Sequence, residues 1–308
     1  MSLLDNEDIL VNDMRGIIEK WIDIYCEILG KYHIENNEIC VDGDVILKDN
    51  DLYPLTTCPY KFKYVTGLFE CSALLENLNN TPYTVGTFDC SNCDKLTSLK
   101  GGPRIVHRFY DCTRCKELTS LEGAPGIIYG YFSCRGCERL ESLKGVPNEI
   151  KGGFNCSYCG LISLKDAPRL IKGSFDCSGC NKLISLNGGP NIVNGDFDCS
   201  TCSELVSLEG GPKCVKYNFL CNECCSLTSL KGCVKQVGGD FDCSGCNKLA
   251  SLEGGPKCVK YDFLCDKCCS LTSLKGCAEQ VGGDLYFNGT KISNHNLLIY
   301  TKQLNNNK

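Results

Sequence analysis

The sequence contains little histidine, tryptophan and methionine, and it has no excess of positive charge. Its 308 residues include three histidines, one tryptophan and two methionines, and the formal net charge is −5. A surface that binds nucleic-acid phosphates needs an excess of lysine and arginine, so the composition argues against nucleic acid as a partner.

Long apolar runs and an export signal are also missing. No segment approaches 18 consecutive apolar residues, the length that a membrane-spanning helix requires. The opening residues MSLLDNEDILVND are acidic and polar, and they lack the apolar region of a secretory signal peptide. We therefore expect an intracellular protein that does not contact a membrane and is not secreted by a signal peptide.

Familiar catalytic motifs are absent too. The chain has no GxSxG, Walker-type or HExxH motif and no recognisable Ser/His/Asp set. We therefore expect a protein without enzymatic activity.

Cysteine is abundant, and most of the cysteines belong to one motif that occurs nine times. Of 28 cysteines, 18 form CxxC pairs that recur every 22 residues, with a single interval of 21. The first cysteines of the pairs are Cys90, Cys112, Cys134, Cys156, Cys177, Cys199, Cys221, Cys243 and Cys265. Their partners are Cys93, Cys115, Cys137, Cys159, Cys180, Cys202, Cys224, Cys246 and Cys268. An aromatic residue precedes each pair by two positions, a Leu-x-Ser-Leu stretch follows it, and in most units a glycine turn comes next.

This pattern predicts a β-solenoid that resembles a leucine-rich repeat, with coils of about 22 residues. The aromatic residue and first cysteine occupy inward positions of a short parallel strand, because inward side chains recur every second residue. The second cysteine takes the asparagine position of the leucine-rich repeat, where the side chain faces the core. Glycine and proline interrupt any helical pattern between strands, so we expect a convex side without helices. The repeated serine is expected to hydrogen-bond the loop backbone.

Atypical units are expected at both ends of the stack, because each end has an open face to cover. An early unit contains Phe69 and Cys71, with Leu74 at the position of the second cysteine. The terminal unit carries Leu285, Phe287 and Thr290 at the three key positions.

The residues outside the repeats differ in kind. Apolar residues at helical spacing predict one or two helices near the N-terminus. These residues are Leu10, Val11, Met14, Ile17, Ile18, Trp21, Ile22, Tyr25 and Ile28. The predicted organisation is a helical N-terminal cap over 1–38, a capping segment over 39–66, the solenoid over 67–290, and a C-terminal cap with a frayed polar tail over 291–308.

Units such as FDCSNCDKLTSLKGGP and FDCSGCNKLASLEGGP resemble the leucine-rich repeats encoded by phages and giant DNA viruses, over roughly residues 67–290. Those relatives commonly carry asparagine where this chain has its second cysteine. The difference makes the chain similar to cysteine-rich, iron–sulfur-associated repeat proteins of mimivirus-like and megavirus-like giant viruses. This resemblance implies that the paired cysteines are cluster ligands, and that the protein occurs in the host cytoplasm or is packaged in the virion.

The stacking of the pairs carries chemistry of its own. Coils about 4.8 Å apart would align the pairs as two sulfur columns, so that two adjacent coils offer four thiolates to one place. Four thiolates suit an iron–sulfur cluster or zinc, and no histidine falls in the motif, so such a site would be all-sulfur. Two other interpretations stay open. Cysteine is also a small buried apolar residue, and neighbouring strands are close enough for disulfides.

The other ten cysteines are not first-choice ligands. Cys26 is interpreted as a helix core residue, Cys40 and Cys58 as cap residues, and Cys71 belongs to the early unit. The remaining six are predicted to pack in the convex-side core, and they are Cys214, Cys225, Cys233, Cys258, Cys269 and Cys277.

The outward strand position between the aromatic residue and the first cysteine is aspartate in five of the nine units, which disfavours nucleic-acid binding there. Leu220 and Leu264 interrupt this acidic stripe, near Tyr217 and Tyr261. An exposed apolar spot of this kind predicts self-association or a protein partner.

Taken together, the sequence predicts a non-enzymatic solenoid that holds iron–sulfur clusters or another thiolate-bound metal along its CxxC pairs. Its role would be electron transfer or storage, or structural stapling of the coils. Zinc, or no cofactor, is the alternative to iron–sulfur. The alternative functions are a protein-interaction scaffold in which cysteine fills the core, and a disulfide-stapled structural protein of the virion.

Overall fold

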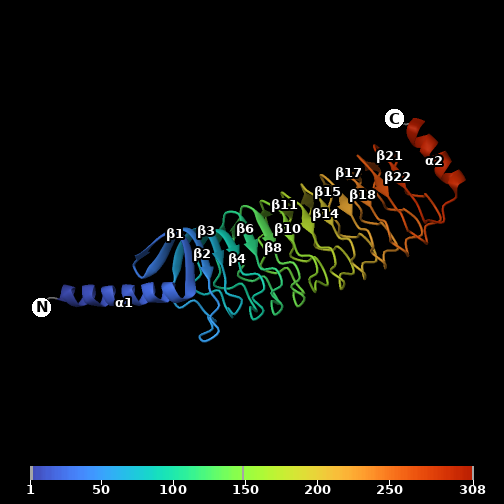
Figure 1. The fold of residues 1–308 in the computed structure, drawn as a ribbon. Helices are drawn as coiled ribbons and strands as arrows, with labels where there is room; N and C mark the ends of the chain where they lie inside the picture. The colour runs from blue at the N-terminus through green and yellow to red at the C-terminus, as the bar shows by residue number, and fades with distance from the viewer. Residues whose placement is uncertain (1–2, 148, 307–308) are drawn as a thin grey trace. The chain divides into compact units, whose positions relative to one another are not determined.

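The structure is a computed structural model that describes residues 3–147 and 149–306, apart from the side chains of residues 3–13, 149 and 303–306. The chain forms two compact units, Met1–Cys134 and Arg135–Lys308, where the sequence predicts one continuous solenoid. In each unit, parallel strands stack coil on coil with a repeat of about 22 residues (Figure 1). The predicted β-solenoid is confirmed, and the described coils carry no helix between their strands.

The first unit combines a helix, a hairpin and the first coils. Helix α1 spans Leu3–Tyr25, and the antiparallel hairpin consists of β1 Cys26–Glu35 and β2 Glu38–Leu47. Parallel strands then follow in the order β3 Phe62–Glu70, β4 Thr84–Asp89, β6 Phe109–Asp111 and β8 Tyr131–Ser133. The short strand β5 Ile105–Val106 pairs with both β4 and β7 Ile127–Ile128.

The second unit contains two parallel ladders of two-residue strands and a final helix. One ladder consists of β10 Phe154–Asn155, β12 Phe175–Asp176, β14 Phe197–Asp198, β16 Phe219–Leu220, β18 Phe241–Asp242, β20 Phe263–Leu264 and β22 Leu285–Tyr286. The other consists of β9 Glu149–Ile150, β11 Leu170–Ile171, β13 Ile192–Val193, β15 Cys214–Val215, β17 Gln236–Val237, β19 Cys258–Val259 and β21 Gln280–Val281. Helix α2 spans Asn294–Asn306.

The N-terminal region is only partly helical, which corrects the prediction of a helical cap over 1–38. Helix α1 ends at Tyr25, and Ile28 lies in strand β1. Asn36 and Asn37, with φ angles of 51° and 60°, form the two-residue turn that joins β1 to β2. Asparagine tolerates this left-handed conformation, and two such residues favour a tight hairpin. The Asn-Asn pair is therefore the sequence signal that separates hairpin from helix here.

Helix α1 still caps the first coil, as predicted. Ile18 is fully buried, and the ring of Trp21 lies 6.3 Å from that of Phe62 at the start of β3. These contacts cover the apolar end of the stack. The side chains of Leu10 and Val11, which the helical pattern includes, lie outside the described part of the chain.

The C-terminal end is helical where the sequence predicts a frayed tail. In α2, the Tyr300 hydroxyl donates a hydrogen bond to the carbonyl of Ala278 in the last coil. Phe287 is buried, and its ring lies 6.2 Å from that of Phe263. Thr290 donates a 2.9 Å hydrogen bond to the carbonyl of Phe287, so the terminal unit closes its own turn. The last two residues of the predicted tail, 307–308, lie outside the described residues.

The early atypical coil uses a different residue from the one predicted at its turn. Leu75 donates its backbone N–H to the carbonyl of Ser72, as Leu96 does to Cys93 in the next coil. Ser72 therefore occupies the position of the second cysteine, and Leu74 is only half-buried. The coil is shortened at this point, so counting residues along the sequence places Leu74 in the wrong position.

An aromatic side chain from each coil forms the core of each unit. In the first unit, the rings of Phe88, Tyr110 and Phe132 follow one another at 5.3 and 5.2 Å between centroids. In the second, neighbouring rings from Phe154 to Phe263 lie 5.1–5.8 Å apart. Ring pairs at such distances contribute about 0.5–1.5 kcal/mol beyond their burial, so this aromatic spine helps to hold successive coils in register.

Polar side chains complete the turns. The Asp198 carboxylate accepts a 2.8 Å hydrogen bond from the backbone N–H of Ser200, and the same bond recurs at Asp89, Asp111, Asp176 and Asp242. The serine of most Leu-x-Ser-Leu stretches accepts a bond from the N–H two residues later, for example that of Lys231 to Ser229 at 3.1 Å. The prediction that these serines bond the loop backbone is confirmed.

The third residue of each CxxC motif lies in the left-handed region, and Thr201 is the least suited residue there. Its φ is 55°, whereas the equivalent positions hold Gly179 and Gly245 with φ of 67° and 72°. Its buried hydroxyl oxygen also has no hydrogen-bond partner. A left-handed β-branched residue and an unsatisfied hydroxyl each destabilise the folded state.

We therefore expect Thr201→Gly to raise the free energy of unfolding by about 1 kcal/mol, measured as a higher denaturant midpoint. The backbone bond from residue 201 to the carbonyl of Asn222 remains available in the variant. The reverse change, Gly245→Thr, serves as the matched control and should lower the midpoint. A lower midpoint for Thr201→Gly would contradict the strain argument.

Candidate functional site

The 18 paired cysteines all lie in the core. Their relative exposure is 0%, apart from 4% for Cys159. In the second unit the strand register aligns the aromatic residues of neighbouring coils, as in the pairing of Phe197 with Phe219. Each first cysteine follows its aromatic residue by two positions and therefore lies on the same inward side. The predicted inward position of both cysteines in each pair is thus confirmed.

The sulfur atoms are held by backbone carbonyls. The thiol of the second cysteine donates to the carbonyl of the first cysteine in the preceding coil, as Cys202 does to Cys177 at 3.3 Å. The same bond recurs at 3.1–3.2 Å from Cys115, Cys180, Cys224, Cys246 and Cys268. Several first cysteines also donate to the next coil, for example Cys199 to the carbonyl of Leu220 at 3.4 Å. A protonated thiol is the form that can make these bonds.

Burial favours the same protonated form. It raises the pKa of Cys177, Cys199 and Cys221 well above the usual value for a thiol, and neighbouring thiols add to the rise. Burial likewise raises the pKa of Cys202 to about 12. These thiols therefore stay neutral at physiological pH, and ionising them inside the core costs free energy.

The last two CxxC coils bring thiols into contact with one another. The sulfurs of Cys243 and Cys265 lie 3.1 Å apart, in direct contact. Hydrogen bonds from the thiols of Cys243 and Cys265 lower the pKa of Cys268, while the bond to Cys265 raises that of Cys243. The Cys268 thiol also donates to the carbonyl of Cys243, so Cys243, Cys265 and Cys268 form one interacting group.

The columns supply the right donor atoms for a soft metal, but not the spacing that a four-thiolate site needs. Zinc–sulfur bonds of about 2.3 Å place tetrahedral sulfur ligands about 3.8 Å from one another. Among the described residues, no three column sulfurs lie within 4.8 Å of one another. The inward space beside them is filled by the buried aromatic and leucine side chains. In this arrangement the columns do not form a closed metal site, and coordination would have to replace the thiol–carbonyl bonds.

The other cysteines occupy several environments. Cys26 is buried at the first residue of β1 rather than in a helix, and Cys40, Cys58 and Cys71 are buried as well. The six cysteines predicted in the convex-side core are less buried than expected. Those that are exposed are Cys214, Cys225 and Cys269, and those that are half-buried are Cys233, Cys258 and Cys277.

The structure places Leu220 and Leu264 on the outer face of their ladder, and both are half-buried. In the register Asp242 lies between them, so the two leucines do not touch along the ladder. Lys216 and Lys260 lie over the rings of the nearby tyrosines, at 5.5 and 5.1 Å from the ring centroids. The predicted contact at these leucines stays a prediction.

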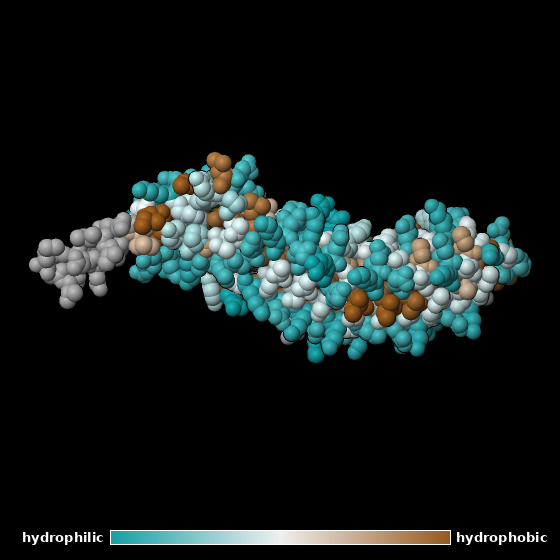
Figure 2. All heavy atoms as spheres, turned by 90° about the horizontal axis from the view of Figure 1, so that it is seen from below, coloured by the Kyte–Doolittle hydropathy of each residue, from teal (hydrophilic) through white to brown (hydrophobic). Residues whose placement is uncertain are grey.

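A larger apolar surface lies elsewhere in the second unit. Ile162, Ile184 and Val206 come from three consecutive coils and are 53%, 58% and 49% exposed. Val206 donates its N–H to the carbonyl of Ile184, so these side chains follow one another along the stack. We call this row the aliphatic ridge, and Figure 2 displays hydrophobic side chains in a row on the second unit. The sequence indicates this ridge at the second position of the Leu-x-Ser-Leu stretch, where Ile or Val replaces the threonine that is common in other coils.

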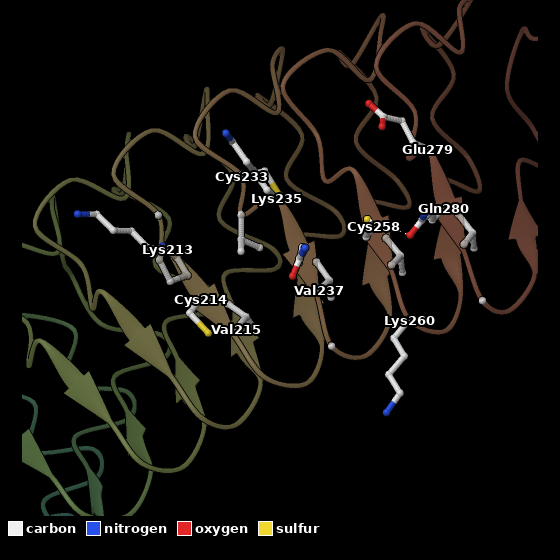
Figure 3. Close-up of a pocket in the computed structure, with 18 of the residues that line it drawn as sticks. Lys213, Cys214, Val215, Cys233, Lys235, Val237, Cys258, Lys260, Glu279 and Gln280 are labelled. Atoms are coloured by element: carbon white, nitrogen blue, oxygen red, sulfur yellow. Dashed lines mark hydrogen bonds between the residues drawn. The ribbon is translucent and has the colours of Figure 1, made fainter. Parts of the chain in front are cut away.

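The second unit also has a shallow groove along the outer face of β15, β17, β19 and β21, with a volume of about 1300 Å³ (Figure 3). Its lining includes Cys214, Cys258 and Gln280, and the thiol of Cys258 lies 3.4 Å from the Gln280 side-chain oxygen. No histidine lines the groove, so its thiols lack the base that a Cys–His nucleophile requires. Glu279 at its rim is paired with Lys257 at 2.8 Å.

Comparisons with known proteins give no match: no family model fits the chain, and no curated protein or solved structure is significantly similar to it. Among the described residues, no helix is both long and apolar enough to span a membrane. The interpretation of the sites therefore depends on the geometry of the chain itself.

The burial of the columns predicts a sharp difference in thiol reactivity. Alkylation of the folded, reduced protein at pH 8 should label Cys214, Cys225 and Cys269 first, because only an accessible thiolate reacts. The 18 column cysteines should react on the order of a hundredfold more slowly, since they are buried and their reaction requires local opening.

Peptide mass spectrometry over a time course measures these rates. Labelling in guanidinium chloride provides the control, because all 28 cysteines are accessible in the unfolded chain. Column peptides that are labelled as fast as the peptide containing Cys214 would contradict the buried arrangement.

Proposed function

We propose that the protein is a non-enzymatic interaction scaffold that self-associates through the aliphatic ridge of its second unit. The observation that supports this is the exposure of Ile162, Ile184 and Val206 on consecutive coils. Large β-branched side chains gain free energy when they leave water, about 25 cal/mol for each Å² buried. A contiguous apolar row on an otherwise polar surface is typical of a contact site.

The ridge favours a second copy of the chain as its partner. Its three side chains are uncharged, so they do not themselves select a charged partner. An apolar stripe can pack against its own copy across a two-fold axis, which is the commonest symmetry of protein dimers. The ridge ends at a polar residue on either side. The equivalent position is Glu141 in the coil before it and Thr228 in the coil after it. Glu141 is paired with Lys182 at 3.6 Å.

In this proposal the cysteine columns serve the core. Their thiols are small, and second cysteines such as Cys180 and Cys202 donate to a buried carbonyl of the preceding coil. Buried carbonyls that lose such partners destabilise a fold by about 1–3 kcal/mol each. The second cysteine thereby uses its thiol to hydrogen-bond the backbone at the position that asparagine occupies in leucine-rich repeats.

The ridge is tested by the triple variant Ile162→Thr, Ile184→Thr and Val206→Thr. Threonine keeps the β-branched shape and occurs naturally at the same position in other coils, as at Thr228 and Thr272. We expect self-association to weaken at least tenfold, measured by sedimentation velocity over a concentration series, because three apolar side chains no longer contribute. The thermal midpoint should change little, since the three positions are exposed.

Two controls sharpen this experiment. Thr228→Ser and Thr272→Ser, at the same position in later coils, should leave the association unchanged. Leu220→Asp with Leu264→Asp tests the contact predicted from sequence, and an effect of this pair alone would assign the interface to those leucines. A wild-type protein that stays monomeric up to about 100 μM would overturn the proposal, as would a triple variant with unchanged association.

A second candidate function is thiolate-bound metal, centred on the last two CxxC coils. The observation that favours it is the 3.1 Å contact between the sulfurs of Cys243 and Cys265, whose thiols also lower the pKa of Cys268. Cys246 belongs to the same two coils and completes a set of four sulfurs. Such a set would hold zinc or an iron–sulfur cluster once the thiol protons are released, and it would link metal binding to the stability of the coils.

Metal and thiol analysis of anaerobically purified protein distinguishes the two candidates. Thiolate-bound iron predicts a brown protein with iron and sulfide near stoichiometry, and zinc predicts a colourless one. In either case Cys268→Ser should lower the metal content at least tenfold, as loss of a ligand does. Metal-free protein with 28 titratable thiols would contradict this candidate and support the thiol core, whereas few titratable thiols would indicate disulfides.

A further inference from the structure

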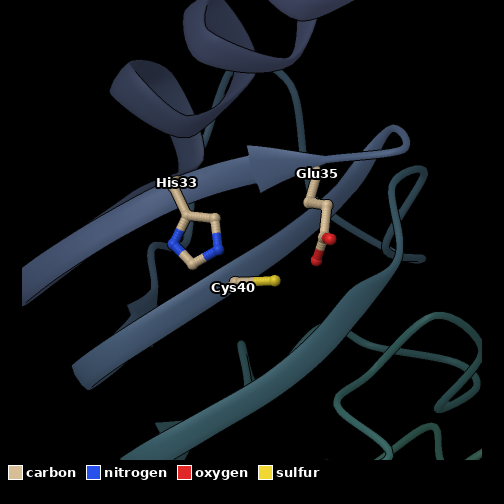
Figure 4. A group of neighbouring side chains, drawn as sticks. All are labelled: His33, Glu35 and Cys40. Carbon is tan, nitrogen blue, oxygen red and sulfur yellow. The ribbon is translucent and has the colours of Figure 1, made fainter.

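The β1–β2 hairpin of the first unit brings together three side chains that no repeat position predicts. The antiparallel register places His33 directly opposite Cys40, and Glu35 lies two residues beyond His33 on the same face of β1. One ring nitrogen of His33, a carboxylate oxygen of Glu35 and the sulfur of Cys40 all lie within 4.8 Å of one another. Among the described residues, this is the group of three potential metal donors that satisfies that distance. Figure 4 shows the three side chains converging over the hairpin.

We propose that His33, Glu35 and Cys40 form a binding site for a borderline divalent transition-metal ion, with Zn²⁺ as the natural occupant. One imidazole, one carboxylate and one thiolate are all ligand types that zinc accepts. Hard cations such as Mg²⁺ and Ca²⁺ prefer oxygen-only sites, so the thiol and imidazole select against them. This site is independent of the proposed function, because it lies in the first unit and uses no column cysteine.

The surroundings favour a three-ligand site with an open position. Cys40 is buried, whereas His33 and Glu35 are exposed, so a bound ion would have the protein on one side and solvent on the other. Three protein ligands with a remaining position for water are typical of open zinc sites. The ring of Tyr64 lies 6.5 Å from that of His33, at 64°, and restricts how far the imidazole can turn.

Lys63 competes with the ion for Glu35. Its ammonium nitrogen lies 2.7 Å from the Glu35 carboxylate, and this hydrogen bond lowers the pKa of the carboxyl group. Lys63 is about half exposed, so its side chain can move into solvent when a metal ion takes its place. The neighbouring Lys61 is paired instead with Glu38, outside the proposed ligand set.

The Cys40 thiol must lose its proton when the metal binds. Burial raises the pKa of Cys40, and the nearby carboxylates of Glu35, Glu38 and Asp42 raise it further, while Lys63 opposes the rise. Metal binding at this site would therefore release the proton of the Cys40 thiol.

The test uses Co²⁺ as a spectroscopic substitute for zinc, added to reduced, chelator-treated full-length protein. Bound Co²⁺ should show thiolate-to-metal charge-transfer absorption that Zn²⁺ removes by displacement. Cys40→Ser should abolish this absorption, and His33→Asn should weaken Co²⁺ binding at least tenfold, as the loss of a ligand does. Lys63→Met should tighten binding roughly fivefold, because a competing positive charge is removed. Far-UV circular dichroism checks that each variant is folded.

Lys61→Met is the matched control, since it removes an equivalent lysine whose partner is not a proposed ligand, and its affinity should equal that of the wild type. Metal bound in the cysteine columns would have only sulfur ligands, so its absorption would survive both Cys40→Ser and His33→Asn. Charge-transfer absorption that persists in these two variants, or wild-type protein that shows none, would overturn the proposal. Neither result bears on the aliphatic ridge, because the ridge is tested by measuring self-association.

Discussion

The stacking of one coil on the next is the interaction on which this structure depends. A single coil of the second unit has strands of only two residues and cannot enclose its own inward side chains. Its aromatic ring, two cysteines and leucines are buried only when neighbouring coils supply the other wall. The aromatic contacts of 5.1–5.8 Å in the second unit and the parallel backbone bonds therefore form together or not at all. The two ends of the chain need caps for the same reason, and α1 and α2 provide them.

This dependence explains why cysteine recurs in the core without drifting. Each inward position repeats every 22 residues, so a side chain there must fit between its own copies. A thiol is small enough to stack, apolar enough to be buried, and able to donate one weak hydrogen bond. The bond from Cys202 to Cys177 and its equivalents use this property in coil after coil. The same burial that keeps the thiols neutral also makes metal coordination costly in most coils.

The candidate sites lie where the repeat is interrupted. The aliphatic ridge arises where three coils replace a polar residue by Ile162, Ile184 and Val206, and the groove lies where cysteine and glutamine alternate along the second ladder. The His33–Glu35–Cys40 group lies before the repeats begin. In a repeat protein the regular positions maintain the stack, so departures from the repeat are the positions free to serve another purpose.

The sequence by itself determined the period, the aromatic spine, the inward cysteines and the serine-bonded turns, because each depends on local spacing that stacking merely multiplies. The end of α1 at Tyr25 and the hairpin after it were not predicted, although Asn36 and Asn37 carry the signal. Tertiary structure alone decided what each sulfur contacts. The carbonyl or second thiol that it meets belongs to a neighbouring coil and is distant along the chain. It also decided that His33 faces Cys40, because that contact depends on the register of two antiparallel strands, which local spacing does not specify.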